Sequence, residues 1–472
     1  MTTAPDTVPD AVPDAEAVRA AVAPLLPRAL DDLRALVAIP SVADERLYPR
    51  TECERAAQWV VDAFRAEGID DARRERTPDG SDVVVGYRPG PPGAPTVLLY
   101  AHYDVQPPLD DAAWTTPPFE LTERGGRLYG RGAADCKGNV VTHLTALRAL
   151  RSLGGDDLPV GVRVVVEGSE EQGTGGLDRW VEQNPGALAA DAMLVQDTGN
   201  ARLGLPTLTV SLRGATTVVL HVEALEGEIH SGMFGGAAPD ALAALVAILA
   251  SLRDAEGNTT IDGVDASGTW PGVPYDAEAF RADAGVLPGT RLLGDGAVAD
   301  MLWARPVVTI LGIDAPSVVG SAAAIQPRAA ARLNLRVPPG ADAQDLQDRL
   351  VAHLEAHAPW GVRVTVQRDA VGQPFAARTE GHVFDTLSAA LADAYGEATV
   401  TAGQGGSIPL CTVLAGQYPD AEIVLLGVEE PACLIHAPNE SVHPSEIENL
   451  AVGEALFLAR LGVSPPSGPS SA

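Results

Sequence analysis

Cysteine and long apolar runs are both scarce in this sequence of 472 residues. The four cysteines are Cys53, Cys136, Cys411 and Cys433, and none of them forms a CxxC pair. This spacing excludes a CxxC-type metal or redox motif and makes reduced thiols the expectation. No stretch approaches the roughly 18 uninterrupted apolar residues of a membrane-spanning helix. We therefore expect a cytoplasmic protein without a membrane partner.

Basic residues are also few, because the sequence has 33 Lys and Arg against 63 Asp and Glu and a net charge of −30. This balance argues against binding to nucleic acid or to anionic membrane surfaces. The stretch from Met1 to Ala15 lacks the basic start and the apolar segment of a secretory signal. The stretch from Ser464 to Ala472 is rich in Pro, Ser and Gly, so we expect a disordered tail.

Short apolar runs alternate with helical stretches along much of the chain. The runs are residues 96–100, 160–166, 192–195 and 423–426, and one of the helical stretches is 139–150. This alternation predicts an α/β domain with a mostly parallel sheet and flanking helices.

The length of the chain predicts more than one domain, since single hydrophobic cores stop growing at about 250–300 residues. Residues 208–372 carry a different, α+β pattern of strands and helices. We predict that they form a domain inserted between the two parts of the sheet domain, residues 1–207 and 373–472.

Acidic residues and histidines follow the ends of the apolar runs. They are His102 and Asp104, then Glu170 and Glu171, then Asp197, and finally His436, while Asp135 lies in a Gly- and Ala-rich segment between them. Each is weak evidence alone, because a Glu-Glu pair is usually solvated surface and an Asp often forms a turn. In open parallel sheets, however, ligands bind outside the carboxyl ends of the strands. The shared position at strand ends therefore predicts one common site.

Two imidazoles and three carboxylates suit a pair of divalent ions such as Zn²⁺. The five predicted ligands are His102, Asp135, Glu171, Asp197 and His436. Asp104 is two residues from His102 and can accept a hydrogen bond from the ring nitrogen that does not bind metal. Because the adjacent side chains of Glu170 and Glu171 diverge, one can bind an ion while the other takes a proton from a metal-bound water.

Most of the remaining histidines give no sign of a site. His353 and His357 have the i, i+4 spacing of a metal pair on a predicted helix, but the sequence places no carboxylate beside them. His230 is different, because it stands in a Gly-rich loop of the inserted domain.

Several segments together resemble the di-zinc peptidase family of carnosinases, bacterial dipeptidases, aminoacylases and glutamate carboxypeptidases. They are His102-Tyr103-Asp104-Val105, Trp114 with Pro118-Phe119, the loop of residues 130–138, Glu170-Glu171, Asp197, the His230 loop, Gly405-Gly406-Ser407-Ile408-Pro409, and His436. They occur in the family's order and cover most of the chain. The resemblance is greatest to the dipeptidase branch, and it implies hydrolysis of dipeptides or short peptides.

The resemblance also implies a role for each residue. Asp135 bridges two ions, most often Zn²⁺ with Mn²⁺ or Co²⁺ as alternatives, with His102 and Asp197 on one ion and Glu171 and His436 on the other. Glu170 is the general base, and the peptide bond between Asp135 and Cys136 is cis.

The inserted domain is implied to act as a lid and a dimerisation domain. In a homodimer of this kind, His230 polarises the scissile carbonyl in the partner's site. Arg336 and the backbone of Gly406 and Ser407 bind the carboxylate of a small peptide substrate.

Two departures from the family pattern are Cys136, where relatives often have Asn or Asp, and Gln404, where relatives often have an acid. The alternative function is an N-acyl-amino-acid deacylase or carboxypeptidase with the same water chemistry. A third possibility is a non-catalytic metal- or peptide-binding protein, against which the complete ligand set and Glu170 argue.

Overall fold

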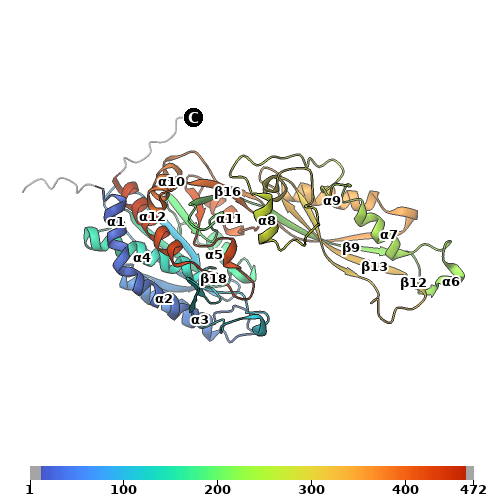
Figure 1. Cartoon of the computed structure of the whole chain (residues 1–472), viewed down its shortest axis with the longest axis horizontal. Coiled ribbons are helices and arrows are strands. Elements are labelled where there is room, and N and C mark those ends of the chain that lie inside the picture. Colours follow the sequence, from blue (N-terminus) through green and yellow to red (C-terminus); the bar gives the residue numbers. More distant parts are fainter. Residues whose placement is uncertain (1–11, 464–472) are drawn as a thin grey trace, which may run out of the picture. The chain divides into compact units, whose positions relative to one another are not determined.

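The computed structural model describes residues 12–463 and divides the chain into two compact units (Figure 1). The first unit comprises the residues up to Val210, Ala377–Ala402, and those from Val413 onward. The second unit comprises Ser211–Ala376 and Gly403–Thr412. Most of the N-terminal stretch and the tail from Ser464 to Ala472, for which disorder is expected, lie outside the described residues.

The first unit contains most of a nine-stranded sheet, which has the order β1-β2-β6-β3-β7-β17-β8-β15 and in which β16 pairs with β8. The strands are β1 Arg73–Arg76, β2 Asp82–Arg88, β3 Thr96–His102, β6 Gly161–Glu167, β7 Ala192–Gln196, β8 Thr207–Leu212, β15 Phe375–Ala376, β16 Val400–Gln404 and β17 Glu422–Leu426. Strands β6, β3, β7 and β17 run parallel, while β2 and β8 flank them in the antiparallel direction. The predicted α/β fold with a mainly parallel central sheet is confirmed.

Helices pack against this sheet, and its central strands β3, β6 and β7 are buried along almost their whole length. The first unit has α1 Ala15–Val22, α2 Leu26–Val37, α3 Thr51–Ala66, α4 Lys137–Gly154, α5 Gly176–Gln183, α10 His382–Tyr395 and α12 Pro444–Val463, and α11 Pro409–Gln417 begins in the second unit. Helix α4 packs against α1, α2, α12 and β3, and its residues from Lys137 to Leu150 are all buried. Because neighbours surround it, this helix has no distinct polar face, and its buried residues include polar ones such as Asn139 and His143.

A small sheet determines how two distant segments meet. Strand β5 (Arg127–Tyr129) pairs with β4 (Thr122–Arg124) and with β18 (Ser441–Val442). The loop that follows β5 carries Asp135, and the loop that precedes β18 carries His436. This pairing therefore brings the two predicted ligands to the same region, although about 300 residues separate them in the chain.

The second unit contains a four-stranded antiparallel sheet with the order β11-β13-β9-β14. Its strands are β9 Gly214–Glu223, β11 Val307–Asp314, β13 Arg328–Val337 and β14 Arg363–Gly372, and helices α7 Ala241–Ala250 and α9 Ala343–Ala356 pack against it. Its shorter elements are β10 Ile229–His230, α6 Ser231–Phe234, α8 Ala277–Asp283 and β12 Ala324–Ile325. Alternate residues of β9 and β13 are buried with the two packed helices, as expected of a sheet with one covered face.

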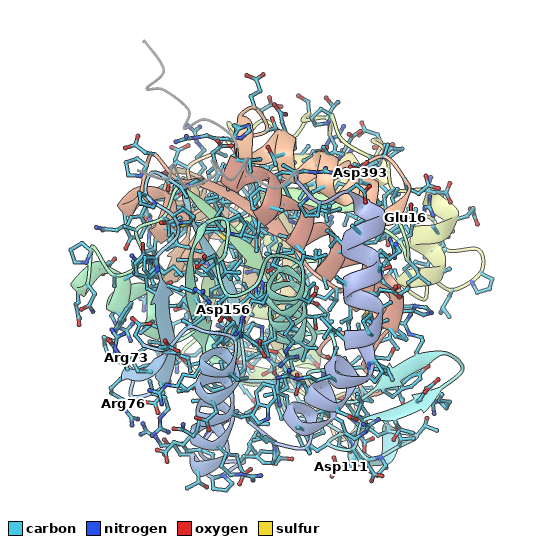
Figure 2. The ribbon with its side chains drawn as sticks, turned by 90° about the vertical axis from the view of Figure 1, so that its left-hand side faces the viewer. Glu16, Arg73, Arg76, Asp111, Asp156 and Asp393 are labelled. Carbon is cyan, nitrogen blue, oxygen red and sulfur yellow. The ribbon has the colours of Figure 1, made fainter. Side chains whose placement is uncertain are left out.

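Charged side chains lie on the outside of the first unit, where water solvates them. Figure 2 labels six of them, and all six are exposed: Glu16, Arg73, Arg76, Asp111, Asp156 and Asp393. Within residues 12–463, none of the helices combines the length and the apolar character that crossing a bilayer requires.

Candidate functional site

Asp135 lies between the two predicted histidine ligands. Its Oδ1 is 2.9 Å from Nε2 of His102, and its Oδ2 is 3.0 Å from Nε2 of His436. His102 is the last residue of β3, and the Asp135 loop leads into α4. One carboxylate thus has an oxygen directed at each of two imidazoles.

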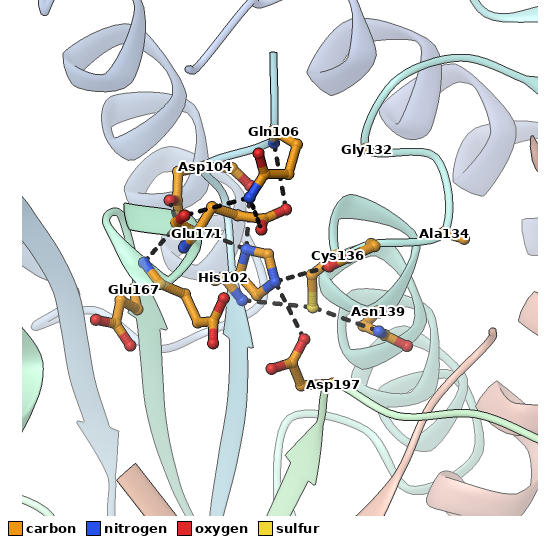
Figure 3. Close-up of polar contacts among 12 residues, drawn as sticks. His102, Asp104, Gln106, Gly132, Ala134, Cys136, Asn139, Glu167, Glu171 and Asp197 are labelled. Atoms are coloured by element: carbon orange, nitrogen blue, oxygen red, sulfur yellow. Dashed lines mark hydrogen bonds and ion pairs between the residues drawn. The ribbon is translucent and has the colours of Figure 1, made fainter. Parts of the chain in front are cut away.

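Each histidine also contacts a second carboxylate. Nε2 of His102 is 3.1 Å from Oδ1 of Asp197, which follows the neighbouring strand β7 (Figure 3). Nε2 of His436 is 3.1 Å from Oε2 of Glu171. All five residues predicted as ligands therefore come together in two groups that share Asp135.

The charges in this cluster attract cations. His102 is fully buried, and although burial lowers its pKa, the nearby Cys136 and Asp197 and hydrogen bonds with Asp104 and Asp135 raise it well above the usual value. Hydrogen bonds with Asp135 and Glu171 raise the pKa of His436 to about 11. A set of imidazole and carboxylate groups that stabilises positive charge in this way fits divalent cations of the Zn²⁺ type.

Asp104 holds the segment that carries the two glutamates. Its carboxylate accepts hydrogen bonds from the backbone N–H of Glu170, at 3.2 Å, and of Glu171, at 3.1 Å. Nδ1 of His102 is 3.0 Å from the backbone oxygen of Asp104 but 3.4 Å from its Oδ1. The predicted pairing of His102 with Asp104 is present, but the closer acceptor is the main-chain carbonyl rather than the carboxylate.

Glu170 is the first residue of the short 3₁₀ turn Glu170–Gln172. In the part of the chain that the structure describes, its side chain has no hydrogen-bond partner. Burial raises the pKa of Glu170 well above its usual value, and the neighbouring Asp197 raises it further. A carboxylate with raised proton affinity beside the two ligand groups is suited to accept a proton.

Comparison with known proteins identifies the family to which this cluster belongs. A model described as "Peptidase family M20/M25/M40" matches residues 98–460, a span that includes all five predicted ligands. The chain belongs to this family.

Three relatives of this M20-family peptidase illustrate the similarity. A cysteinylglycine-S-conjugate dipeptidase of Corynebacterium striatum is 46% identical over 413 residues, which cover 87% of this chain and 90% of the relative. The Cys-Gly metallodipeptidase DUG1 of Candida albicans is 28% identical over 462 residues, or 90% and 93% of the two chains. The crystal structure of human carnosine dipeptidase 1 superposes with a TM-score of 0.77 at 26% identity, over 96% of this chain and 100% of that one.

Arg131 and Glu440 support the site of this M20 peptidase, but the sequence did not indicate either of them as a site residue. Both are fully buried, and Nη1 of Arg131 is 2.7 Å from Oε2 of Glu440. The Glu440 carboxylate also accepts hydrogen bonds from the backbone N–H of Gly132, Ala134 and Asp135, at 2.9, 3.0 and 3.1 Å. Glu440 therefore fixes the loop from which Asp135 projects. The only sequence signal was its position four residues after His436.

Arg131 also holds the two neighbouring loops. Its Nη2 donates to the carbonyl oxygens of Pro107 and Ala437, each at 3.3 Å. The first loop follows His102 and the second follows His436, whose φ of 64° is uncommon for a residue other than glycine. One buried guanidinium thus connects three ligand-bearing segments.

Gln106 and Glu429 are two further residues that sequence reasoning missed. The Gln106 side chain donates to Oε2 of Glu171 at 2.8 Å, and its backbone N–H donates to Oε1 at 3.2 Å (Figure 3). Glu429 is buried, and one of its carboxylate oxygens lies within 4.8 Å of oxygens of Asp135 and Asp197. Burial and these two acids raise the pKa of Glu429 well above its usual value.

Cys136 packs beside the cluster as a buried thiol. Its Sγ donates to the carbonyl oxygen of Gln196 at 3.0 Å. It also accepts from Nδ2 of Asn139 at 3.3 Å (Figure 3). Burial raises the pKa of Cys136 to about 12. These contacts give it a packing role rather than that of a thiolate ligand. The peptide bond between Asp135 and Cys136 is cis, so that prediction is confirmed.

The only lysine of the chain anchors the beginning of α4. Lys137 is fully buried, and its Nζ donates to the carbonyl oxygens of Leu36, at 3.0 Å, and Ile39, at 2.7 Å. Both acceptors lie at or just after the C-terminal end of α2, where a cation is favourable. Burial lowers the pKa of Lys137 to about 7.

The other predicted site residues belong to the second unit. His230 is exposed in β10, and its Nδ1 accepts a hydrogen bond from the backbone N–H of Gly232 at 3.0 Å. Arg336 lies in β13, and Gly406 and Ser407 lie in the turn before α11.

A second cluster in the same unit consists of Asp262, His353 and His357. Asp262 is the carboxylate neighbour that the sequence analysis did not find. Nδ1 of His353 accepts from the backbone N–H of Asp262 at 3.1 Å, and its Nε2 is 2.9 Å from Oγ of Ser251, which itself donates to Ile248. Both nitrogens of His353 are therefore occupied, and the cluster is a hydrogen-bonded contact rather than an ion site.

Proposed function

We propose that this protein is a metal-dependent dipeptidase that hydrolyses dipeptides or short peptides in the cytoplasm. One observation carries the proposal: Asp135 directs its two oxygens at His102 and His436, each of which contacts a further carboxylate. Relatives with dipeptidase names support the choice of substrate over N-acyl amino acids. The relative with 46% identity makes peptides of the Cys-Gly type the first candidates.

Two divalent cations are the proposed cofactors. His102, Asp135 and Asp197 would hold one ion, and His436, Asp135 and Glu171 would hold the other. The preference for Zn²⁺, with Mn²⁺ or Co²⁺ as alternatives, follows from the mixture of nitrogen and oxygen donors. When bound, such ions supply Lewis-acid chemistry that polarises a carbonyl oxygen and makes water more acidic.

Glu170 is proposed as the general base. Its pKa is raised, and its carboxylate has no hydrogen-bond partner among residues 12–463; both features suit it to take the proton of the attacking water and then to give it to the leaving amine. Asp104 and Gln106 would act indirectly, because they fix the backbone of Glu170 and the side chain of Glu171.

The second unit is proposed to act as a lid and to pair two copies of the chain. Its edge strand β11 has exposed apolar side chains, with Ile310, Leu311 and Ile313 at 45%, 56% and 47% exposure. An unpaired, apolar edge strand is suited to pair with a second copy. His230 would then donate to the scissile carbonyl in the partner's site.

Arg336 is proposed to bind the carboxylate of the peptide, together with the backbone N–H groups of Gly406 and Ser407. A guanidinium matches the planar geometry of a carboxylate, and consecutive N–H groups of a turn form a suitable concave anion site.

One assay separates the proposed function from its alternatives. Purified protein is incubated with dipeptides, including Cys-Gly, and with N-acyl amino acids, each with and without added Zn²⁺ or Mn²⁺. We expect metal-dependent release of amino acids from the dipeptides. Faster turnover of the N-acyl amino acids would indicate the deacylase, and no turnover of either class by metal-loaded protein would indicate a binding protein.

A further inference from the structure

Arg213 and Arg336 lie near one another in the second unit. Arg213 is the residue between β8 and β9, and in the register of β9 with β13 Arg336 pairs with Ala215, two residues further along. Residues two apart in extended chain point to the same side. Arg213 and Arg336 are therefore diagonal neighbours on one side of the sheet, close enough for the charge of Arg336 to act on Arg213.

Neither arginine has an anionic partner in the part of the chain that the structure describes. Among the described residues, no carboxylate forms an ion pair or a side-chain hydrogen bond with Arg213 or Arg336, whereas Arg148, for comparison, contacts both Asp32 and Glu67. Nε of Arg213 is buried and has no hydrogen-bond partner within residues 12–463. Burial lowers the pKa of Arg213 to about 10, and the charge of Arg336 acts in the same direction.

This arrangement is unusual in a chain with 63 acidic and 33 basic residues. Two adjacent guanidiniums repel one another, and a partly buried one loses hydration without gaining a counter-charge. An anion bound to both would remove this repulsion and satisfy the free N–H groups. The pair thus has the character of an anion site.

A glycine turn completes one wall of the site. A Cβ atom at Gly405 would lie 2.8 Å from Nη2 of Arg213, so the guanidinium rests against the backbone of this turn and would have to shift if a side chain were added. The backbone N–H of Arg213 donates to the carbonyl oxygen of Gln404 at 3.3 Å, which connects the two segments. Gly406 and Ser407 follow directly, and both are already candidates for carboxylate binding.

We propose that Arg213 is the second guanidinium of this anion site, and that Arg213 and Arg336 together bind the free C-terminal carboxylate of the peptide substrate. The inference rests on the proposed dipeptidase function and adds to it a residue that determines specificity. A site with two cationic groups selects peptides that end in a free carboxylate over amidated ends and over internal positions of a longer chain.

The test compares a dipeptide, Ala-Ala, with its C-terminal amide in the metal-loaded enzyme. The wild-type protein should prefer the acid. In Arg213→Gln, KM for the acid should rise by about 10- to 100-fold, since a hydrogen bond to a charged group contributes about 1.5–3 kcal/mol. Because the amide carries no carboxylate, its KM should stay within about threefold, and kcat should change little for either substrate.

The matched control is Arg332→Gln. Arg332 lies on β13 like Arg336, but it is exposed and pairs with Asp369 at the surface. Its removal should change neither KM. A second readout is binding alone: in the Glu170→Gln background, calorimetry should show weaker binding of Ala-Ala when Arg213→Gln is added.

The outcomes separate this inference from the proposed function. If the metal-loaded wild-type protein hydrolyses no dipeptide, the proposed function is wrong. If it hydrolyses Ala-Ala but Arg213→Gln leaves KM unchanged, or raises KM equally for acid and amide, Arg213 does not bind the carboxylate. Should Arg213→Gln melt below the assay temperature, Arg213→Lys is used, and an unchanged ratio of acid to amide in that variant overturns the inference.

Discussion

Arg131 and Glu440 form a fully buried ion pair that joins the loop of Asp135 to the loop of His436. Each oxygen of Glu440 accepts two hydrogen bonds: Oε2 from Arg131 and Gly132, and Oε1 from Ala134 and Asp135. The pair therefore acts on the site indirectly, because it sets the position of the one carboxylate that both histidines share.

Glu440→Gln should weaken metal binding by about 10- to 100-fold, the usual effect of removing a group that orients a ligand. In Gln an NH₂ group replaces one carboxylate oxygen, and this group cannot accept a hydrogen bond. It would face two N–H donors whose hydrogen bonds the carboxylate oxygen accepts in the wild-type protein. Competition with a chromogenic chelator measures the metal affinity.

The control for this change is Glu448→Gln on α12. Among the described residues, Glu448 makes a partly exposed ion pair with Arg19 at 3.5 Å and no hydrogen bond or ion pair with a predicted ligand. Wild-type metal affinity in Glu440→Gln would show that the hydrogen bonds of Glu440 do not determine how Asp135 is placed.

Glu170→Gln should retain metal but lose at least about 10²-fold in kcat, because the amide keeps the shape of the side chain and cannot take a proton. Glu171→Gln should show the reverse pattern, with reduced metal content, since its Oε2 lies 3.1 Å from Nε2 of His436. Elemental analysis and steady-state kinetics on the same preparations distinguish the two. Loss of metal in Glu170→Gln would instead make Glu170 a ligand.

The sequence predicted the central sheet, and three of the five clustered residues, from local signals. Apolar runs mark the strands, and His102, Glu171 and Asp197 each follow one of them within five residues. Parallel strands then bring their carboxyl ends together, which is a property of the fold class rather than of any single contact.

Contacts between segments that are distant in the chain could not be predicted from the sequence. Glu440 meets residues about 300 positions earlier, and nothing in its local pattern distinguishes it from a surface acid. Nothing in the sequence distinguishes Arg213 from the other arginines, because only the pairing of β9 with β13 brings Arg336 near it. The antiparallel outer strands and β11 were also missed, because β11 has apolar residues that stay exposed and so lacks the usual alternation.

Removal of the metal should abolish activity and lower the melting temperature. Ions that bind only the folded protein stabilise it by RT ln(1 + [M]/Kd), or about 4 kcal/mol at a thousandfold excess over Kd. Dialysis against a chelator, followed by calorimetry and by addition of Zn²⁺, Mn²⁺ or Co²⁺, measures both effects. The same chelator saturated with metal beforehand is the control. Full turnover by protein shown to be metal-free would contradict the proposed cofactors.

His230→Ala should keep both metals while kcat falls by about 10²- to 10³-fold, the scale for loss of one oxyanion donor.

If the histidine acts in the partner's site, mixing His230→Ala with Glu170→Ala should restore activity. Each mixed dimer would contain one site with neither defect and one with both. Random exchange would restore about one quarter of the wild-type sites in an equimolar mixture.

Exchange must be shown independently, by mass spectrometry of differently labelled subunits. The control mixture pairs His230→Ala with His230→Ala/Glu170→Ala, in which every site lacks the histidine and no activity should return. Absence of rescue despite complete exchange would mean that His230 acts within its own chain or not at all.

Two substitutions on the exposed edge of β11 test the proposed dimer directly. Ile310→Glu and Ile313→Glu should each dissociate the dimer, which light scattering measures. They should also reduce kcat as His230→Ala does, because a lone chain would lack its partner's histidine.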